Sequence, residues 1–230
     1  MIGAVLRAPA VTADAFADAP EPSGAAPLFP AEAALVAGAV AARRAEFTGV
    51  RACARAALDR LGVAPAPLLP GPGGAPVWPD GIVGSLTHCR GYRGAAVARA
   101  GELRTIGCDA EPDEPLPRPG MLDMIALPVE RARLRALRLR DPSICWDRLL
   151  FSAKESVYKA WYPLTGRWLD FEEAAVTLDP KTRTFRAELL VPGPEVDGRA
   201  LTGFDGRWAA GRGLLLTAVA VPAAAVLPAG

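Results

Sequence analysis

Two short segments of this sequence carry side chains whose types and spacing could do chemistry. Asp109 and Glu111 stand two residues apart in an expected strand, so they point the same way, roughly 6.6 Å apart along it. Glu155 and Lys159 stand four residues apart in an expected helix, and their side chains leave its axis about 40° apart. Three carboxylates and a lysine form a set that can hold a hard divalent cation together with phosphate oxygens. The pattern predicts a centre for group transfer at a metal-bound pyrophosphate.

Each segment also has a structural interpretation. Ser152 and Glu155 fit a helix-capping box, and Glu155 followed by Lys159 is the favoured order for an ion pair on a helix surface. Asp109 and Glu111 could simply end a strand before Pro112. For either segment alone the structural interpretation is the commoner one, and only their combination with the residues around His88 favours a site.

His88 is the single histidine of the chain and follows Thr87 at the end of an expected strand, beside a turn. A lone histidine is more often structural than catalytic. Here the neighbouring Thr87 adds a hydroxyl, and the two side chains together could meet a phosphate.

Composition narrows the class of protein. The 230 residues are 51% hydrophobic and 22% charged, an ordinary globular mixture with a substantial core. The formal net charge of +1 argues against a nucleic-acid binder, and the apolar run 213–226 is broken by Pro222 and too short to span a membrane. The four cysteines show no zinc spacing, so we expect reduced, mostly buried thiols in a cytoplasmic protein: Cys53, Cys89, Cys108 and Cys145. No signal peptide is evident at the N-terminus.

The expected elements place these residues. Residues 9–30 are predicted as an irregular lead-in, followed by a helix over 31–61 that is interrupted near Thr48 and Gly49. Six prolines and five glycines make 62–81 a loop. Strands are predicted over 81–100 (two, joined at Arg90 and Gly91), 103–109, 174–178, 184–190 and 214–221, and helices over 128–139 and 151–162. No internal repeat is evident, and the mixture predicts an α+β fold with a seam at 112–119.

The ordered motifs resemble the Sfp-type 4′-phosphopantetheinyl transferases, most closely their actinobacterial subgroup, which includes the mycobacterial enzyme. The resemblance runs from about residue 30 to the C-terminus and rests on four blocks: 43–51, 77–89, Gly107-Cys-Asp-Ala-Glu111 and 151–161. It implies two similar α+β halves related by a pseudo-twofold, with the active site at their interface. We expect residues 1–111 to form the N-terminal half and 112–230 the C-terminal half.

The resemblance also implies an activity, the transfer of 4′-phosphopantetheine from coenzyme A to a serine of an acyl or peptidyl carrier protein. The other product would be adenosine 3′,5′-bisphosphate. The carrier proteins would be those of polyketide, nonribosomal-peptide or fatty-acid synthesis, and the enzyme would be a cytoplasmic monomer that binds neither nucleic acid nor a membrane.

Roles for individual residues follow from the same resemblance. Asp109, Glu111 and Glu155 would bind Mg²⁺, with Mn²⁺ as an alternative. Glu155 would also help to deprotonate the acceptor serine, and Lys159 would stabilise or protonate the leaving phosphate. The phosphates of coenzyme A would be held by a further set: Arg43, Arg51, Thr87, His88, Lys154 and Lys159.

The chain departs from this pattern in the loop 70–75, where close relatives carry lysines and one helps to bind coenzyme A. Here the loop reads Pro70-Gly-Pro-Gly-Gly-Ala75, without any base. Either another arginine substitutes or the contact is lost. Cys108, where relatives carry an aliphatic residue, is expected to be a tolerated core change.

Two alternatives stay open from the residues alone. A metal-dependent hydrolase of coenzyme A-like pyrophosphates would use the same carboxylates with a positioned water. A module that binds carrier proteins without chemistry would not need three carboxylates and Lys159, so their presence counts against it.

Overall fold

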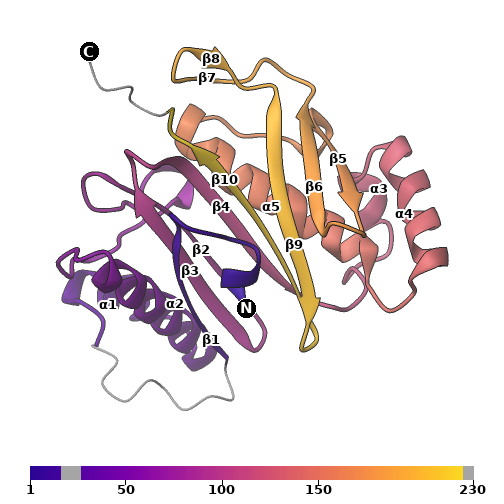
Figure 1. Ribbon diagram of the computed structural model, residues 1–230. Coiled ribbons are helices and arrows are strands. Elements are labelled where there is room, and N and C mark those ends of the chain that lie inside the picture. Colours follow the sequence, from indigo (N-terminus) through magenta and orange to yellow (C-terminus); the bar gives the residue numbers. More distant parts are fainter. Residues whose placement is uncertain (17–26, 225–230) are drawn as a thin grey trace.

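The computed structural model describes residues 1–16 and 27–224 and shows two helix-on-sheet halves side by side (Figure 1). The helices are α1 (Pro30–Leu35), α2 (Ala41–Arg60), α3 (Met121–Ile125), α4 (Pro128–Arg140) and α5 (Trp146–Thr165). The strands are β1 (Val11–Phe16), β2 (Ile82–Cys89), β3 (Tyr92–Arg99), β4 (Leu103–Pro112), β5 (Ala174–Asp179), β6 (Thr184–Leu189), β7 (Glu195–Val196), β8 (Arg199–Ala200), β9 (Gly203–Gly211) and β10 (Leu214–Pro222). The predicted α+β class is confirmed.

The N-terminal sheet has the order β1-β3-β2, and α2 covers one of its faces. Both pairings are antiparallel, with Val11 opposite Val97 and His88 opposite Arg93. The core between this sheet and α2 is built from small and aliphatic side chains, among them Ala54, Leu58 and Val97. Alanines on α2 allow the helix to approach the sheet closely, which brings its pocket-facing side chains near β2.

The C-terminal sheet has the order β4-β10-β9-β6-β5, and α5 lies across it. Its core is larger and more aromatic, with Trp161, Phe204 and Trp208 packed against α5 and α4. A further cluster joins the two sheets, where Tyr92 of β3 packs with Ile106 of β4 and Leu216 of β10.

The strands β2 and β4 lie alongside one another where the halves meet, without a backbone ladder between them. The hydroxyl of Ser85 accepts a hydrogen bond of 3.0 Å from the Cys108 N–H, in place of a ladder bond. The division at 111 and 112 remains a prediction. By its hydrogen bonds β4 belongs to the sheet of the C-terminal strands, since Asp109 lies opposite Thr217 of β10.

Several expected boundaries are corrected. Residues 11–16 form β1, although 9–30 was predicted to be irregular; residues 17–26 of that segment lie outside the described residues. The helix over 31–61 breaks at 36–40 and not near Thr48 and Gly49. Gly49 lies inside α2, where a Cβ would meet the side chain of Arg93 at 3.2 Å, so the glycine serves close packing on β3 and does not end the helix. The strand β9 was not predicted, because its glycines and charges mask the apolar alternation.

The helix α5 begins five residues before its predicted start, which excludes the capping-box interpretation of Ser152. That residue lies in the second turn, fully buried, and its hydroxyl hydrogen-bonds the Thr217 hydroxyl over 2.9 Å. Within the described ranges 1–16 and 27–224, no helix is long and apolar enough to cross a membrane.

Candidate active site

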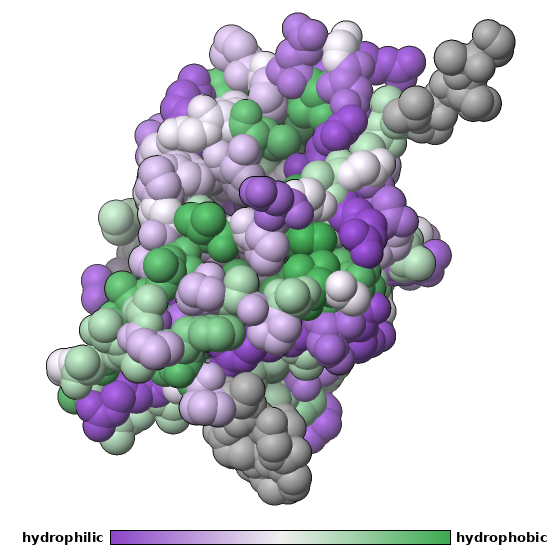
Figure 2. Space-filling view, turned by 90° about the vertical axis from the view of Figure 1, so that its left-hand side faces the viewer, coloured by the Kyte–Doolittle hydropathy of each residue, from purple (hydrophilic) through white to green (hydrophobic). Residues whose placement is uncertain are grey.

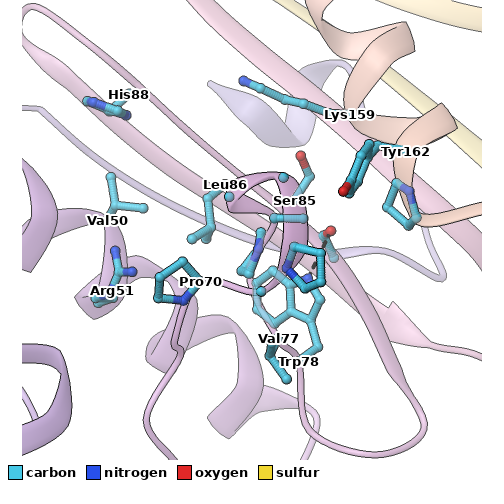
Figure 3. Close-up of a pocket in the computed structure, with 18 of the residues that line it drawn as sticks. Val50, Arg51, Pro70, Val77, Trp78, Ser85, Leu86, His88, Lys159 and Tyr162 are labelled. Atoms are coloured by element: carbon cyan, nitrogen blue, oxygen red, sulfur yellow. Dashed lines mark hydrogen bonds between the residues drawn. The ribbon is translucent and has the colours of Figure 1, made fainter. Parts of the chain in front are cut away.

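A pocket of about 1070 Å³ opens between the two halves. Its walls are α2, the loop 70–78, β2 and the middle of α5. In Figure 3, Val50 and Arg51 of α2 face Lys159 and Tyr162 of α5 across the cavity, with Trp78 at its floor. The volume lies at the upper end of the about 300–1,000 Å³ found for small-molecule sites. The pocket can therefore take a large organic ligand.

Arg43 and His88 meet on the N-terminal wall. The Arg43 guanidinium donates to Nε2 of His88 over 2.9 Å, and the Glu46 carboxylate lies 3.6 Å from Arg43 and 3.8 Å from His88. Partial burial, with help from the charge of Arg43, lowers the pKa of His88 below its ordinary value. The imidazole is thus neutral at pH 7, with Nδ1–H left as its donor.

Arg51 is held more firmly than Arg43. Its guanidinium lies 3.2 Å from the centre of the Phe47 ring, and one terminal nitrogen donates to the Leu68 carbonyl over 3.1 Å. Burial lowers the pKa of Arg51 to about 10, in spite of the nearby Glu32 carboxylate. The side chain lines the pocket as a fixed positive group.

Lys159 crosses from α5 to the end of β4. Its ammonium donates to Asp109 Oδ1 over 2.7 Å and to the Cys108 carbonyl over 3.1 Å. Burial is the largest influence on Lys159 and opposes its charge, but the neighbouring negative groups, Asp109 foremost, together outweigh burial and raise the pKa above the ordinary value. The ion pair excludes the alternative in which Lys159 simply pairs with Glu155 on a helix surface.

Gly107 allows this close approach of β4 to α5. A methyl group at that position would lie 1.9 Å from the Ser156 carbonyl oxygen, a distance no real contact tolerates. Two residues further along β4, Asp109 therefore reaches Lys159. The glycine of the Gly107–Glu111 motif thus has a packing role.

Burial and a neighbouring negative charge destabilise the ionised forms of Glu111 and Glu155 near this end of the pocket. Burial and the charge of Asp109 raise the pKa of Glu111 to about 7, although Arg148 donates to Glu111 over 2.9 Å. Burial and Asp109 also raise the pKa of Glu155. The structure thus places Asp109 close enough to both Glu111 and Glu155 for its charge to disfavour ionisation of each.

These residues fit a divalent cation in chemistry. Asp109 Oδ2 is buried without a hydrogen-bond partner, and across the described chain Glu155 makes no hydrogen bond or ion pair. A cation would satisfy both groups and relieve the repulsion that raises the two pKa values. Among the described residues, no group of three or more Asp, Glu, His or Cys side chains is arranged to hold a metal ion.

Lys154 requires a correction, because the structure turns it away from the pocket. Its ammonium lies 2.9 Å from the Glu130 carboxylate and donates to the carbonyls of Phe171 and Ala174. The side chain is only 3% exposed. With three partners inside the C-terminal half, Lys154 is not among the side chains that could reach a phosphate in the pocket.

The glycine-rich loop closes the pocket at α5. Gly73 has φ +65°, and a methyl group there would lie 2.3 Å from the Tyr162 ring. The loop 70–75 therefore contributes backbone and shape to the wall, without a charged side chain. Thr87 is buried, its hydroxyl has no hydrogen-bond partner, and it does not line the pocket.

Three neighbours of the predicted residues escaped the sequence analysis: Glu46, Arg148 and Tyr162. Each acts through a contact with a residue on another element, which local spacing does not reveal. Glu46 and Tyr162 also had a local signal, since they stand three residues after Arg43 and Lys159 on the same helices. None of the four cysteines, all of them within the described residues, forms a disulfide; Cys53 and Cys108 are buried, and Cys89 and Cys145 are partly so.

Comparison with known proteins agrees with this geometry. Residues 31–98 match the 4′-phosphopantetheinyl transferase N-terminal domain, and residues 105–201 match the 4′-phosphopantetheinyl transferase superfamily. The chain is 62% identical over 225 residues to the 4′-phosphopantetheinyl transferase Svp of Streptomyces mobaraensis, covering 98% of this chain and 91% of that one. It is 53% identical over 203 residues to PptT of Mycobacterium tuberculosis (86% and 88% covered), and 52% identical over 199 residues to Npt of Nocardia iowensis (83% and 88% covered).

The chain thus has an α+β fold with a pocket lined by Arg43, Arg51 and Lys159, and it is similar to these proteins along nearly its whole length. The chain belongs to the 4′-phosphopantetheinyl transferase family. It is an enzyme that transfers phosphopantetheine from coenzyme A to carrier proteins, and the hydrolase alternative finds no support.

Proposed function

We propose that coenzyme A binds in the pocket between the halves and that transfer takes place where β4 meets α5. One observation carries the proposal: the wall with Arg43, Arg51 and His88 faces Glu155 and Lys159 across a single cavity. Cations on one side suit the phosphates of a donor. Acidic groups and a lysine on the other suit the reaction at its pyrophosphate.

Donor binding would use the N-terminal wall. Arg43 and Arg51 present guanidinium groups, which bind phosphate in bidentate fashion. His88 would donate from Nδ1 while Arg43 fixes its ring through Nε2. Lys159 would reach the pyrophosphate from the other side. We keep Thr87 as a weaker candidate, because its unpartnered hydroxyl could bond a phosphate only after a local movement. Lys154 is left out.

Asp109, Glu111 and Glu155 would hold Mg²⁺, or Mn²⁺ with the same oxygen ligands. The cation would supply charge neutralisation at the pyrophosphate. The protein supports this role with its own contacts, because Arg148 holds Glu111 and Lys159 holds Asp109 at the end of β4. Asp109 Oδ2, which has no hydrogen-bond partner in the protein, would then be the oxygen that binds the cation.

Glu155 would act as the base, directly or through a water. It takes the proton of the acceptor serine hydroxyl as the serine oxygen bonds to the β-phosphorus of coenzyme A. The bond from that phosphorus to the bridging oxygen breaks, and adenosine 3′,5′-bisphosphate leaves with the electron pair. Lys159 stabilises or protonates that oxygen. Burial, the largest cause of the raised pKa of Glu155, favours its acceptance of a proton.

The acceptors that we propose are apo acyl or peptidyl carrier proteins of polyketide, nonribosomal-peptide or fatty-acid synthases. We further propose a cytoplasmic monomer without nucleic-acid or membrane partners, with residues 1–111 supplying the donor site and 112–230 the helix α5. The near-neutral net charge supports the absence of a nucleic-acid partner.

The test combines the purified protein, an apo acyl carrier protein, coenzyme A and Mg²⁺, and measures the mass of the carrier. A gain equal to one phosphopantetheine arm is expected. Free bisphosphate without that gain would indicate a hydrolase, and no change would indicate a binding module. Chelation of the metal with EDTA should abolish the gain, and addition of excess Mg²⁺ or Mn²⁺ should restore it.

A further inference from the structure

One short sequence recurs in the two halves and forms the same local structure. Pro30-Ala-Glu32 opens α1, and Pro128-Val-Glu130 opens α4. In both helices the glutamate accepts the N–H of the residue before the proline, Phe29 or Leu127, over 3.0 and 2.7 Å. Both glutamates are buried, at 0% and 1% exposure. A Pro-x-Glu match, with only two identical residues, is too short to stand out in the sequence.

Each glutamate also clamps two further segments of its own half. Glu32 accepts the Leu68 N–H over 2.9 Å, and Glu130 accepts the Val176 N–H over 2.6 Å. Each then meets a cation of the 20-residue helix that covers the sheet of its half. For Glu130 this is Lys154 of α5, and for Glu32 the cations are Arg51 and Arg55 of α2.

The two clamps differ in charge and in direction. In the C-terminal half one carboxylate meets one ammonium, whose other bonds go to two carbonyls inside the same half. In the N-terminal half one carboxylate serves two guanidinium groups. Arg55 takes the closer contact, at 3.0 Å, while Arg51 Nε lies 3.7 Å from the carboxylate and has no hydrogen-bond partner.

Arg51 is therefore oriented without being fully neutralised. Glu32 lies behind it, the Phe47 ring lies against its plane, and the Leu68 carbonyl takes one terminal nitrogen. Leu68 is itself fixed by Glu32 and leads directly into the loop that walls the pocket. The buried carboxylate of Glu32 thus helps to position both the Arg51 guanidinium and the Leu68 backbone, whose carbonyl accepts a hydrogen bond from that guanidinium.

We propose that Glu32 is a positioning residue for the donor, which orients Arg51 toward the phosphates of coenzyme A, whereas its counterpart Glu130 serves only the fold. This inference rests on the proposed function of Arg51. Glu32 carries one negative charge and faces two guanidinium groups, so one positive charge is left without a matching carboxylate in the clamp. A ligand with several phosphates supplies the missing negative charge. The two halves would then share one clamp, of which only the N-terminal copy serves binding.

The recurrence supplies a matched pair of variants, Glu32→Gln and Glu130→Gln. Both should lower the melting temperature, because each leaves buried cations without their carboxylate. Only Glu32→Gln should raise the KM for coenzyme A, roughly tenfold, the scale of one hydrogen bond to a charged group, with kcat little changed. Combined with Arg51→Met, it should add nothing further to the KM that Arg51→Met alone gives.

Equal KM values in the two glutamine variants would overturn the proposal. So would a lower KM in Glu32→Gln, or a further rise when it is added to Arg51→Met. Should Glu32→Gln fail to fold, Glu32→Asp keeps the charge but withdraws it by one methylene, and an unchanged KM there would overturn the proposal equally. An Arg51→Met variant with the wild-type KM would instead remove Arg51 from the donor site, and a wild-type protein that transfers nothing would refute the proposed function itself.

Discussion

The two walls of the pocket hold their charges in different ways. On the N-terminal wall each cationic or basic group has a partner from its own half, Arg43 with His88 and Arg51 with Glu32. On the opposite wall stand Glu155 and Lys159 of α5, and Lys159 is paired with Asp109, whose Oδ2 lacks a hydrogen-bond partner. Burial and the charge of Asp109 raise the pKa of Glu155. The surface of the N-terminal half in Figure 2 also shows apolar patches among polar ones, and its exposed residues include Leu35, Val40 and Val77.

We propose that this difference between the walls separates donor binding from chemistry. Groups that are held in place before a ligand arrives lose little freedom on binding, which suits donor recognition. Groups that repel one another are stabilised when a cation and a reacting phosphate arrive, which suits a centre whose charge changes during the reaction. Variants of the first wall should therefore alter KM, and variants of the second wall should alter kcat.

The largest effect is expected for Glu155→Gln. Loss of the base should lower kcat by about 10²–10⁴-fold, while the fold stays intact because the carboxylate has no hydrogen-bond or ion-pair partner to lose among the described residues. Turnover of an apo carrier protein at saturating Mg²⁺ measures the loss of kcat, and circular dichroism checks that the fold is intact. Glu114→Gln, at an exposed carboxylate nearby, is the control. Turnover within tenfold of wild type would remove Glu155 from the chemistry.

Lys159→Met should come next, with kcat lowered roughly 10²-fold and the affinity for coenzyme A much less affected, because charge on the leaving oxygen develops only in the transition state. The variant should also lose about 1–3 kcal/mol of stability, since Asp109 Oδ1 loses the ammonium that bonds it while Oδ2 already has no hydrogen-bond partner. Steady-state kinetics and urea unfolding distinguish the two effects. A stability loss with unchanged kcat would make Lys159 purely structural.

His88→Ala tests the binding wall and should raise the KM for coenzyme A about tenfold, with kcat retained, because its proposed phosphate contact exists before and during the reaction. Arg99→Gln, at an exposed site near the far end of β3, is the matched control. Desphospho-coenzyme A, which lacks the 3′-phosphate, tells which phosphate His88 meets. If wild type and variant discriminate equally between the two donors, the 3′-phosphate is not its partner.

The smallest effect is a change of stability with pH. The pKa of Glu111 is raised from 4.5 to about 7, so between these values the folded state binds more protons than the unfolded state and stability falls as the pH rises. In EDTA, wild type should therefore lose about 1–2 kcal/mol relative to Glu111→Gln between pH 4.5 and 8. Urea unfolding at the two pH values measures the difference, and Mg²⁺ at pH 8 should reduce it. If the stability of wild type and of Glu111→Gln changes in parallel with pH, the pKa of Glu111 is not raised in the folded protein.

Local spacing was a good guide to the acidic residues. Asp109 and Glu111 stand two residues apart in β4 and so share one face of it, as expected. The period of a helix places Glu155 and Lys159 on neighbouring parts of α5. The strands of the β2–β3 hairpin were predicted because Gly91, with φ +82°, marks the turn between two apolar runs. These features depend on residues only a few positions apart, so the sequence contains them.

The contacts that decide roles lie outside that range. Lys154 and Lys159 stand in the same motif, yet one is bonded to Glu130 of α4 and the other to Asp109 of β4. Five residues along a helix turn a side chain by about 140°, and which neighbour it then meets depends on how α5 packs. Sequence reasoning assigned both lysines to phosphate binding for lack of that information.

The sequence by itself determined the family, the acidic pair on β4 and the positions of Glu155 and Lys159 on α5, because motif identity and backbone period are local properties. The tertiary structure alone decided that Lys154 faces the C-terminal core, that Gly73 packs on Tyr162, and that Glu32 stands behind Arg51. Each of these contacts joins segments far apart in the chain, and only the packing of helices on sheets brings such segments together.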